Sequence, residues 1–97
     1  MARTRYLVSY DIRDDKRLRR VHASMKGFGW AMQYSVFVCD LDEVEVLDLK
    51  RNIGEIINAR VDSIAIVRLG SPQERGRSCF EFMGVPPYLP RAGAVVL

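Results

Sequence analysis

The sequence contains few residues that form disulfides or bind soft metals. Cys39 and Cys79 are the only cysteines, and His22 is the only histidine, among 97 residues. A structural zinc site needs about four such ligands at short spacings, so the chain offers none. Because disulfides are rare in the cytoplasm, we expect both cysteines to be reduced thiols.

Long hydrophobic runs are also missing. No apolar stretch approaches the roughly 20 residues that a membrane-spanning helix requires, and residues 1–5 lead into a predicted strand without the apolar core of a signal peptide. There are no internal repeats or low-complexity segments. We therefore expect a cytoplasmic protein, and a hydrophobic content of 48% over 97 residues is typical of one globular domain.

Charge is present but unevenly distributed along the chain. Residues 1–26 contain eight Lys or Arg and three Asp, whereas residues 40–62 contain three Lys or Arg and seven Asp or Glu. The overall net charge is only +3. Such an asymmetric field directs a polyanion toward the first third of the chain, although a solvated helix face without a partner gives the same pattern.

Hydrophobic periodicity and capping signals predict an alternating order of strands and helices. The predicted strands are residues 5–10, 30–33, 35–39, 62–69 and a further short strand at 79–83, and the predicted helices are 15–26 and 42–58. This is a β-α-β-β-α-β order, which predicts an α+β, ferredoxin-like sandwich with an extra C-terminal strand and two helices on one face of an antiparallel sheet.

The predicted domain covers residues 1–84, including a C-terminal interface strand. Residues 85–97 form a proline-containing tail. The sequence leaves two alternatives for this tail, addition to a partner's sheet edge or disorder. The near-continuous apolar run of residues 62–69 predicts an inner position in the sheet.

One carboxylate ends the first predicted strand, and it is the candidate for metal chemistry. An aspartate there, Asp11, can hold a hard divalent cation, whereas Asp14 and Asp15 are better explained as caps of the following helix. A single carboxylate holds a metal weakly. Two copies related by a two-fold axis would bring two Asp11 side chains together, where they share a proton or a cation.

The helix that follows has a basic face. Its apolar face carries His22, which is more plausibly a core or interface residue than a general base, and the opposite face is rich in Lys and Arg. Basic side chains on one face hold phosphates without sequence preference. The predicted nucleic-acid-binding residues are Arg13, Lys16, Arg17, Arg19 and Arg20.

Three segments together resemble a known family. They are Tyr6-Leu-Val-Ser-Tyr10-Asp11-Ile-x-Asp14-Asp15, the pair Arg20-Val21, and Gln33-Tyr34-Ser35-Val36-Phe37-x-Cys39. In this order and spacing they resemble the CRISPR-associated protein two family, the small partner of the integrase in spacer acquisition. The resemblance covers residues 5 to about 69.

The resemblance implies a homodimer whose C-terminal strand pairs with the other subunit's sheet, and a magnesium ion between paired Asp11 side chains. It implies Tyr10 and Asp11 as catalytic residues, with Ser35 and Phe37 near the interface. Members have been reported to cleave RNA or DNA and also to bridge integrase dimers without catalysis. The implied partners are therefore the integrase, duplex DNA and single-stranded RNA.

One departure from the family pattern bears on the activity. Many members have an arginine where this chain has Ala31, and loss of that side chain removes a charge-assisted contact to phosphate. This favours the bridging role, with metal-dependent nuclease activity as the main alternative. A third interpretation, a ferredoxin-like regulatory domain that binds a small ligand, has no marker in the sequence.

Overall fold

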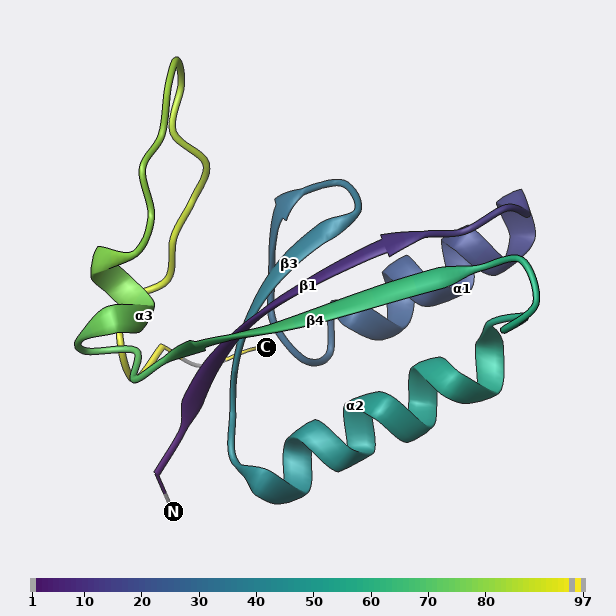
Figure 1. Ribbon diagram of the computed structural model, residues 1–97, viewed down its shortest axis with the longest axis horizontal. Coiled ribbons are helices and arrows are strands. Elements are labelled where there is room, and N and C mark those ends of the chain that lie inside the picture. Colours follow the sequence, from purple (N-terminus) through teal and green to yellow (C-terminus); the bar gives the residue numbers. More distant parts are fainter. Residues whose placement is uncertain (1, 95, 97) are drawn as a thin grey trace.

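The computed structural model describes residues 2–94 and 96. Its elements are β1 (Thr4–Asp11), α1 (Asp15–Met25), β2 (Trp30–Gln33), β3 (Val36–Leu41), α2 (Glu43–Ile56), β4 (Ser63–Gly70) and α3 (Arg75–Ser78). The four strands form one antiparallel sheet in the order β2-β3-β1-β4. The predicted ferredoxin-like order is confirmed, and α1 and α2 lie along one side of the sheet (Figure 1).

The core lies between the sheet and these two helices. Alternate residues of a strand point to the same face, so Tyr6, Val8 and Tyr10 of β1 all face the helices. They pack against buried residues of α1, α2 and β3, namely Val21, Met25, Leu49, Ile53, Phe37, Cys39 and Leu41. Burial of such a side chain stabilises the fold by about 1.5–3 kcal/mol.

Both long helices begin at aspartate caps, as the sequence predicts. The Asp14 side chain accepts a hydrogen bond from the backbone N–H of Arg17, which makes Asp14 the cap of α1 and places Asp15 in its first turn. Asp42 and Glu45 form a reciprocal capping box at the start of α2. The N–H of Glu45 lowers the pKa of Asp42 by stabilising its charged form.

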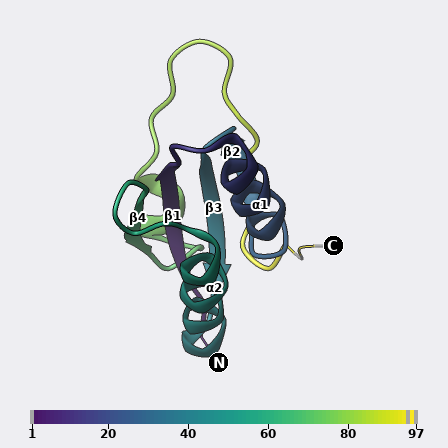
Figure 2. The same ribbon diagram turned by 90° about the vertical axis from the view of Figure 1, so that its right-hand side faces the viewer.

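The predicted inner position of residues 62–69 is wrong. β4 lies at an edge of the sheet, and β1 and β3 occupy the inner positions (Figure 2). Along β4, Ile64 and Ile66 pack on the core, whereas Ala65 and Val67 face outward and are exposed. The run reads as continuously apolar because its outer face is apolar too, and not because both faces are covered.

Residues 79–83 do not form the extra strand in the single chain. They follow the short helix α3, which the sequence did not predict, and enter a long loop that projects from the rest of the molecule (Figures 1 and 2). A strand needs a sheet edge to pair its backbone groups, and this loop leaves the sheet. Residues 95 and 97 of the predicted tail lie outside the described residues.

Within residues 2–94 and 96, none of the helices has both the length and the apolar character needed to cross a bilayer.

Candidate functional site

The Asp11 carboxylate stands exposed at the end of β1. Its backbone pairs with Ser63 of β4, and its side chain is 70% exposed. The nearest cation is Arg13, whose Nη2 lies 3.9 Å from Asp11 Oδ2. An ion pair between exposed groups at this distance contributes little energy, so the Asp11 carboxylate is available to a ligand or a second chain.

Asp11 shares its face of the sheet with small and apolar side chains. We call the exposed part of this side of the sheet, opposite α1 and α2, the open face. By the strand register it consists of Leu7, Ser9, Asp11, Val36, Ser63, Ala65 and Val67, whereas Arg5, Val38 and Asp40 lie on the same side but are buried. Each residue of the open face is partly or largely exposed. The open face is therefore an apolar surface with one acidic end.

A buried carboxylate that the sequence analysis missed holds the loop after Asp11. The Asp62 side chain is fully buried and accepts four hydrogen bonds: from the backbone N–H groups of Arg13 (2.9 Å) and Asn58 (2.8 Å), and from Nε (2.7 Å) and Nη2 (3.1 Å) of Arg17. The Arg17 guanidinium, followed by the two N–H groups, holds the pKa of Asp62 well below its usual range. No local motif marks Asp62, because its main partner lies 45 residues away.

Arg17 is consequently committed to the fold. Its guanidinium is paired with Asp62, lies 3.9 Å from Asp14 Oδ2, and is only one-quarter exposed. The hydrogen bond to Asp62 raises the pKa of Arg17 further. Of the predicted phosphate-binding residues, Arg17 is the one whose charge is already balanced inside the chain.

The other predicted basic residues are available at the surface. Arg13, Lys16, Arg19 and Arg20 are exposed. Within the part of the chain that the structure describes, Lys16, Arg19 and Arg20 take part in no ion pair. They lie on α1, which begins four residues after Asp11. The structure thus places an uncommitted basic surface beside the strand end.

Tyr10 points away from Asp11, into the core. It is 5% exposed, its hydroxyl donates to the Tyr34 carbonyl (2.9 Å), and its oxygen lies 2.9 Å from Nδ1 of His22. Burial raises the pKa of Tyr10 to about 12, so its hydroxyl stays protonated at neutral pH. The structure does not bring Tyr10 and Asp11 together, and the Tyr10 hydroxyl anchors the turn between β2 and β3.

That turn also contains the predicted interface residues. The Ser35 carbonyl accepts a hydrogen bond from the backbone N–H of Tyr10 (3.0 Å), which ties the turn to β1. Phe37 is fully buried and meets the His22 ring edge-on, with ring centroids 5.4 Å apart. His22 also stacks on Tyr34, so it is a packing residue, as the sequence indicates. Ala31 lies exposed on β2, opposite Phe37 in the register.

One chain does not complete a metal site. Among residues 2–94 and 96, no group of three or more His, Cys, Asp or Glu side chains is placed to hold an ion. Asp11 contributes a single carboxylate, whereas Mg²⁺ takes six oxygen ligands, commonly one or two of them carboxylate. The other oxygen ligands of an ion at Asp11 would therefore have to come from water, nucleic-acid phosphates or another chain.

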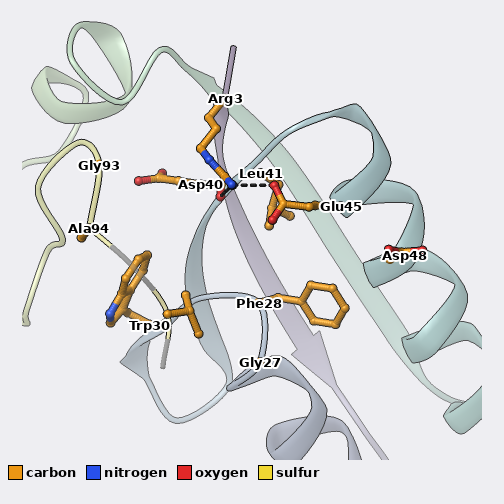
Figure 3. Close-up of a pocket in the computed structure, with 11 residues that line it drawn as sticks. Arg3, Gly27, Phe28, Trp30, Asp40, Leu41, Glu45, Asp48, Gly93 and Ala94 are labelled. Atoms are coloured by element: carbon orange, nitrogen blue, oxygen red, sulfur yellow. Dashed lines mark hydrogen bonds and ion pairs between the residues drawn. The ribbon is translucent and has the colours of Figure 1, made fainter. Parts of the chain in front are cut away.

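A separate hollow of about 400 Å³ lies between the start of α2, the α1–β2 loop and the C-terminal segment (Figure 3). Its walls include the aromatic rings of Phe28 and Trp30. Arg3 donates to the Asp40 carbonyl (2.8 Å) and to the Glu45 carboxylate in this hollow. These polar groups satisfy one another, and none of the predicted site residues lines the hollow.

The fold and the site define a ferredoxin-like protein with an acidic strand end beside a basic helix. A family model described as "CRISPR associated protein Cas2" matches residues 4–76. The chain belongs to this family, which confirms the resemblance found in its motifs. The match includes β1, α1 and the whole Asp62 network.

Individual proteins are similar to this chain in sequence and in structure. A protein of Geobacter sulfurreducens named "CRISPR-associated endoribonuclease Cas2" is 45% identical over 65 residues, which cover 67% of this chain and 68% of that protein. The structure of the hypothetical protein TT1823 from Thermus thermophilus is similar, with a TM-score of 0.77, 31% identity, and coverage of 90% of this chain and 98% of that one. Cas2 of Streptococcus pyogenes, solved at pH 6.5, gives a TM-score of 0.71 at 33% identity, covering 82% and 99% of the two chains.

Proposed function

We propose that this chain acts in CRISPR spacer acquisition as a homodimer that contacts DNA and bridges integrase dimers. The observation that carries the proposal is the open face, an exposed patch of small and apolar residues on the sheet that ends at Asp11 and lies next to the basic face of α1. Family membership supports the CRISPR context, and the two exposed surfaces support the proposed dimer and DNA contacts.

The apolar surfaces support a homodimer. Val67 on the open face is 45% exposed, and on the projecting loop Met83 and Val85 are 95% and 94% exposed. Apolar side chains this exposed are available to be buried against a partner. β4 also has one unpaired edge, and a free edge accepts an added strand. Residues 79–83 of a second copy are the proposed strand, which accounts for the absence of strand pairing at 79–83 in the single chain.

The basic face of α1 supports contact with nucleic acid. Lys16, Arg19 and Arg20 are spaced by three and four residues, so they lie on one side of the helix. Phosphates of a duplex bind such a surface through charge, independent of sequence. Arg17 lies on the same helix, and its hydrogen bond to Asp62 holds the start of that helix in place.

The test of DNA contact is the salt dependence of duplex binding. We expect the double substitution Arg19→Glu and Arg20→Glu to weaken binding and to flatten the plot of log affinity against log salt by about 0.9 per lost phosphate contact. Fluorescence anisotropy with a labelled duplex measures both. Lys50→Glu on α2 makes one such charge reversal on another exposed surface and is expected to leave the slope unchanged. An equal slope in wild type and the double variant would remove α1 from the interface.

A second candidate function is metal-dependent cleavage of RNA or DNA, favoured by the exposed Asp11 carboxylate and by the names of relatives such as "CRISPR-associated endoribonuclease Cas2". Two Asp11 side chains, one from each copy, would hold a Mg²⁺ ion that polarises the phosphoryl oxygen and lowers the pKa of water. Arg13, Lys16 and Arg20 would hold the nucleic-acid backbone. Tyr10, which is buried and protonated, acts through the turn that it anchors.

Asp11→Ala separates the two functions. If cleavage depends on Asp11, the variant loses hydrolysis of RNA and DNA in magnesium and loses Mg²⁺ binding by calorimetry, while Asp15→Ala, a neighbouring exposed carboxylate, keeps both. Equal hydrolysis by wild type and Asp11→Ala shows that the activity is a contaminant. The bridging function predicts that Asp11→Ala still supports spacer acquisition. Bridging also does not require the family's arginine, which is Ala31 in this chain.

A further inference from the structure

A fully buried arginine connects β1 to the C-terminal part of the chain. Arg5 lies near the start of β1 on the same face as Leu7, and its exposed fraction is 0%. Its Nε and Nη2 donate to the two carboxylate oxygens of Asp40 on β3, at 2.7 and 2.8 Å. Nη1 also donates to the Gly76 carbonyl (3.2 Å), and Nη2 to the Pro90 carbonyl (2.8 Å).

This burial is tolerated because every charge and polar atom is matched. Asp40 neutralises the guanidinium through two parallel bonds, the strongest geometry for such a pair. The two carbonyls accept from two of the three remaining N–H groups, so each of the three guanidinium nitrogens has a partner. Across the described residues, no buried side-chain nitrogen or oxygen is left without a hydrogen-bond partner.

The two carbonyls bracket one segment of the chain. We call residues 77–89, between Gly76 and Pro90, the arm. The arm contains the exposed apolar residues Phe82, Met83, Val85 and Tyr88. The arm consists of the end of α3 and the long loop that projects beyond it (Figure 1). One side chain, Arg5, therefore holds both ends of the arm and closes it as a cross-link would.

Gly76 permits this closure. A Cβ atom at position 76 would lie 2.6 Å from the Ser71 carbonyl oxygen and 2.9 Å from Cβ of Arg5. Such contacts are too short, so the backbone of α3 reaches the guanidinium only because residue 76 has no side chain. Pro90 is buried at the other end of the arm, where it offers a carbonyl and needs no partner for an N–H.

We propose that Arg5 is a positioning residue that holds the arm in place for pairing with a second copy of this chain. The proposal rests on the homodimer proposed above and names the residue that organises its pairing strand. Lysine cannot replace arginine here, because one ammonium group lacks the planar fork that reaches a carboxylate and two carbonyls together.

A spin label on Cys79 tests the proposal in the full-length chain. Cys79 is exposed at the end of α3, whereas Cys39 is fully buried and burial raises the pKa of its thiol to about 12, so labelling is selective. We expect Arg5→Lys to increase the mobility of the label and to raise the dimer dissociation constant about tenfold or more. Arg3→Lys, which alters a neighbouring arginine that touches neither carbonyl, is expected to change neither.

Each outcome decides one claim. Unchanged label mobility in Arg5→Lys overturns the claim that Arg5 orders the arm. Increased mobility with unchanged dimerisation overturns the claim that Arg5 prepares the arm for pairing. A wild-type protein that stays monomeric contradicts the proposed homodimer, and its label mobility still tests whether Arg5 orders the arm. If Arg5→Lys does not fold, Gly76→Ala displaces α3 while keeping the ion pair, and the same two measurements apply.

Discussion

Asp62 links three parts of the chain through one buried carboxylate. It accepts hydrogen bonds from the loop after Asp11, from α1 through Arg17, and from the segment after α2. The exposed Asp11 therefore sits on a backbone whose next turn is rigidly held. Removing one member of such a network leaves the other charge buried without its partner, which is costly.

Asp62→Asn is expected to lower the midpoint of thermal unfolding by about 5–10 °C. Because the folded-state pKa of Asp62 lies below its ordinary value of 3.8, its stabilisation is complete above that value and is lost as the pH falls through the folded-state pKa. Wild-type stability should therefore fall more steeply below pH 4 than that of Asp62→Asn. Calorimetric scans across this pH range measure both effects. Asp15→Asn, an exposed carboxylate, serves as the control, and parallel pH profiles would contradict the role of Asp62.

At the scale of elements, α1 combines local and long-range support. Asp14 caps its first turn, and its apolar face places Val21 and Met25 in the core. Its opposite face leaves Lys16, Arg19 and Arg20 in solvent. The helix that presents the basic surface is thus fixed at its start by a cap and along its length by packing.

Asp14→Ala is expected to lower the free energy of unfolding by about 0.5–2 kcal/mol, because it leaves the N–H of Arg17 without an acceptor. Denaturant titration followed by circular dichroism measures the change. Asp15→Ala changes an aspartate one position later that caps nothing and is expected to cost less. Equal losses in the two variants would mean that the cap contributes no more than general charge near the helix start.

At the scale of the whole molecule, two exposed surfaces differ in chemistry. The open face is apolar and ends at Asp11, whereas the exposed side of α1 is basic. A dimer formed through the open face leaves α1 of both copies at the outside of the sandwich. Such a dimer would therefore carry two basic surfaces, one on α1 of each copy.

Val67→Lys tests this arrangement. Val67 is 45% exposed in the single chain, so a lysine there changes monomer stability by only about 0.5 kcal/mol. In the proposed dimer the same lysine is buried without a partner, and we expect the dissociation constant to rise about 100-fold. Sedimentation equilibrium measures it. Val44→Lys on α2, at a residue 60% exposed, is the matched control, and unchanged dimerisation of Val67→Lys would place the interface elsewhere.

The sequence alone determined the order of the elements, the caps at Asp14 and Asp42, the core face of α1 and the family motif around Asp11. All of these depend on residues close together in the chain, where periodicity and spacing are informative. Only the tertiary structure decided that β4 is an edge strand, that residues 79–83 lie in a projecting loop, and that Arg17 is bound to Asp62. It also revealed the hydrogen bond from Arg5 to the Pro90 carbonyl, which joins residues 85 positions apart. Such partners are chosen by how the sheet and helices pack, and no local pattern records that choice.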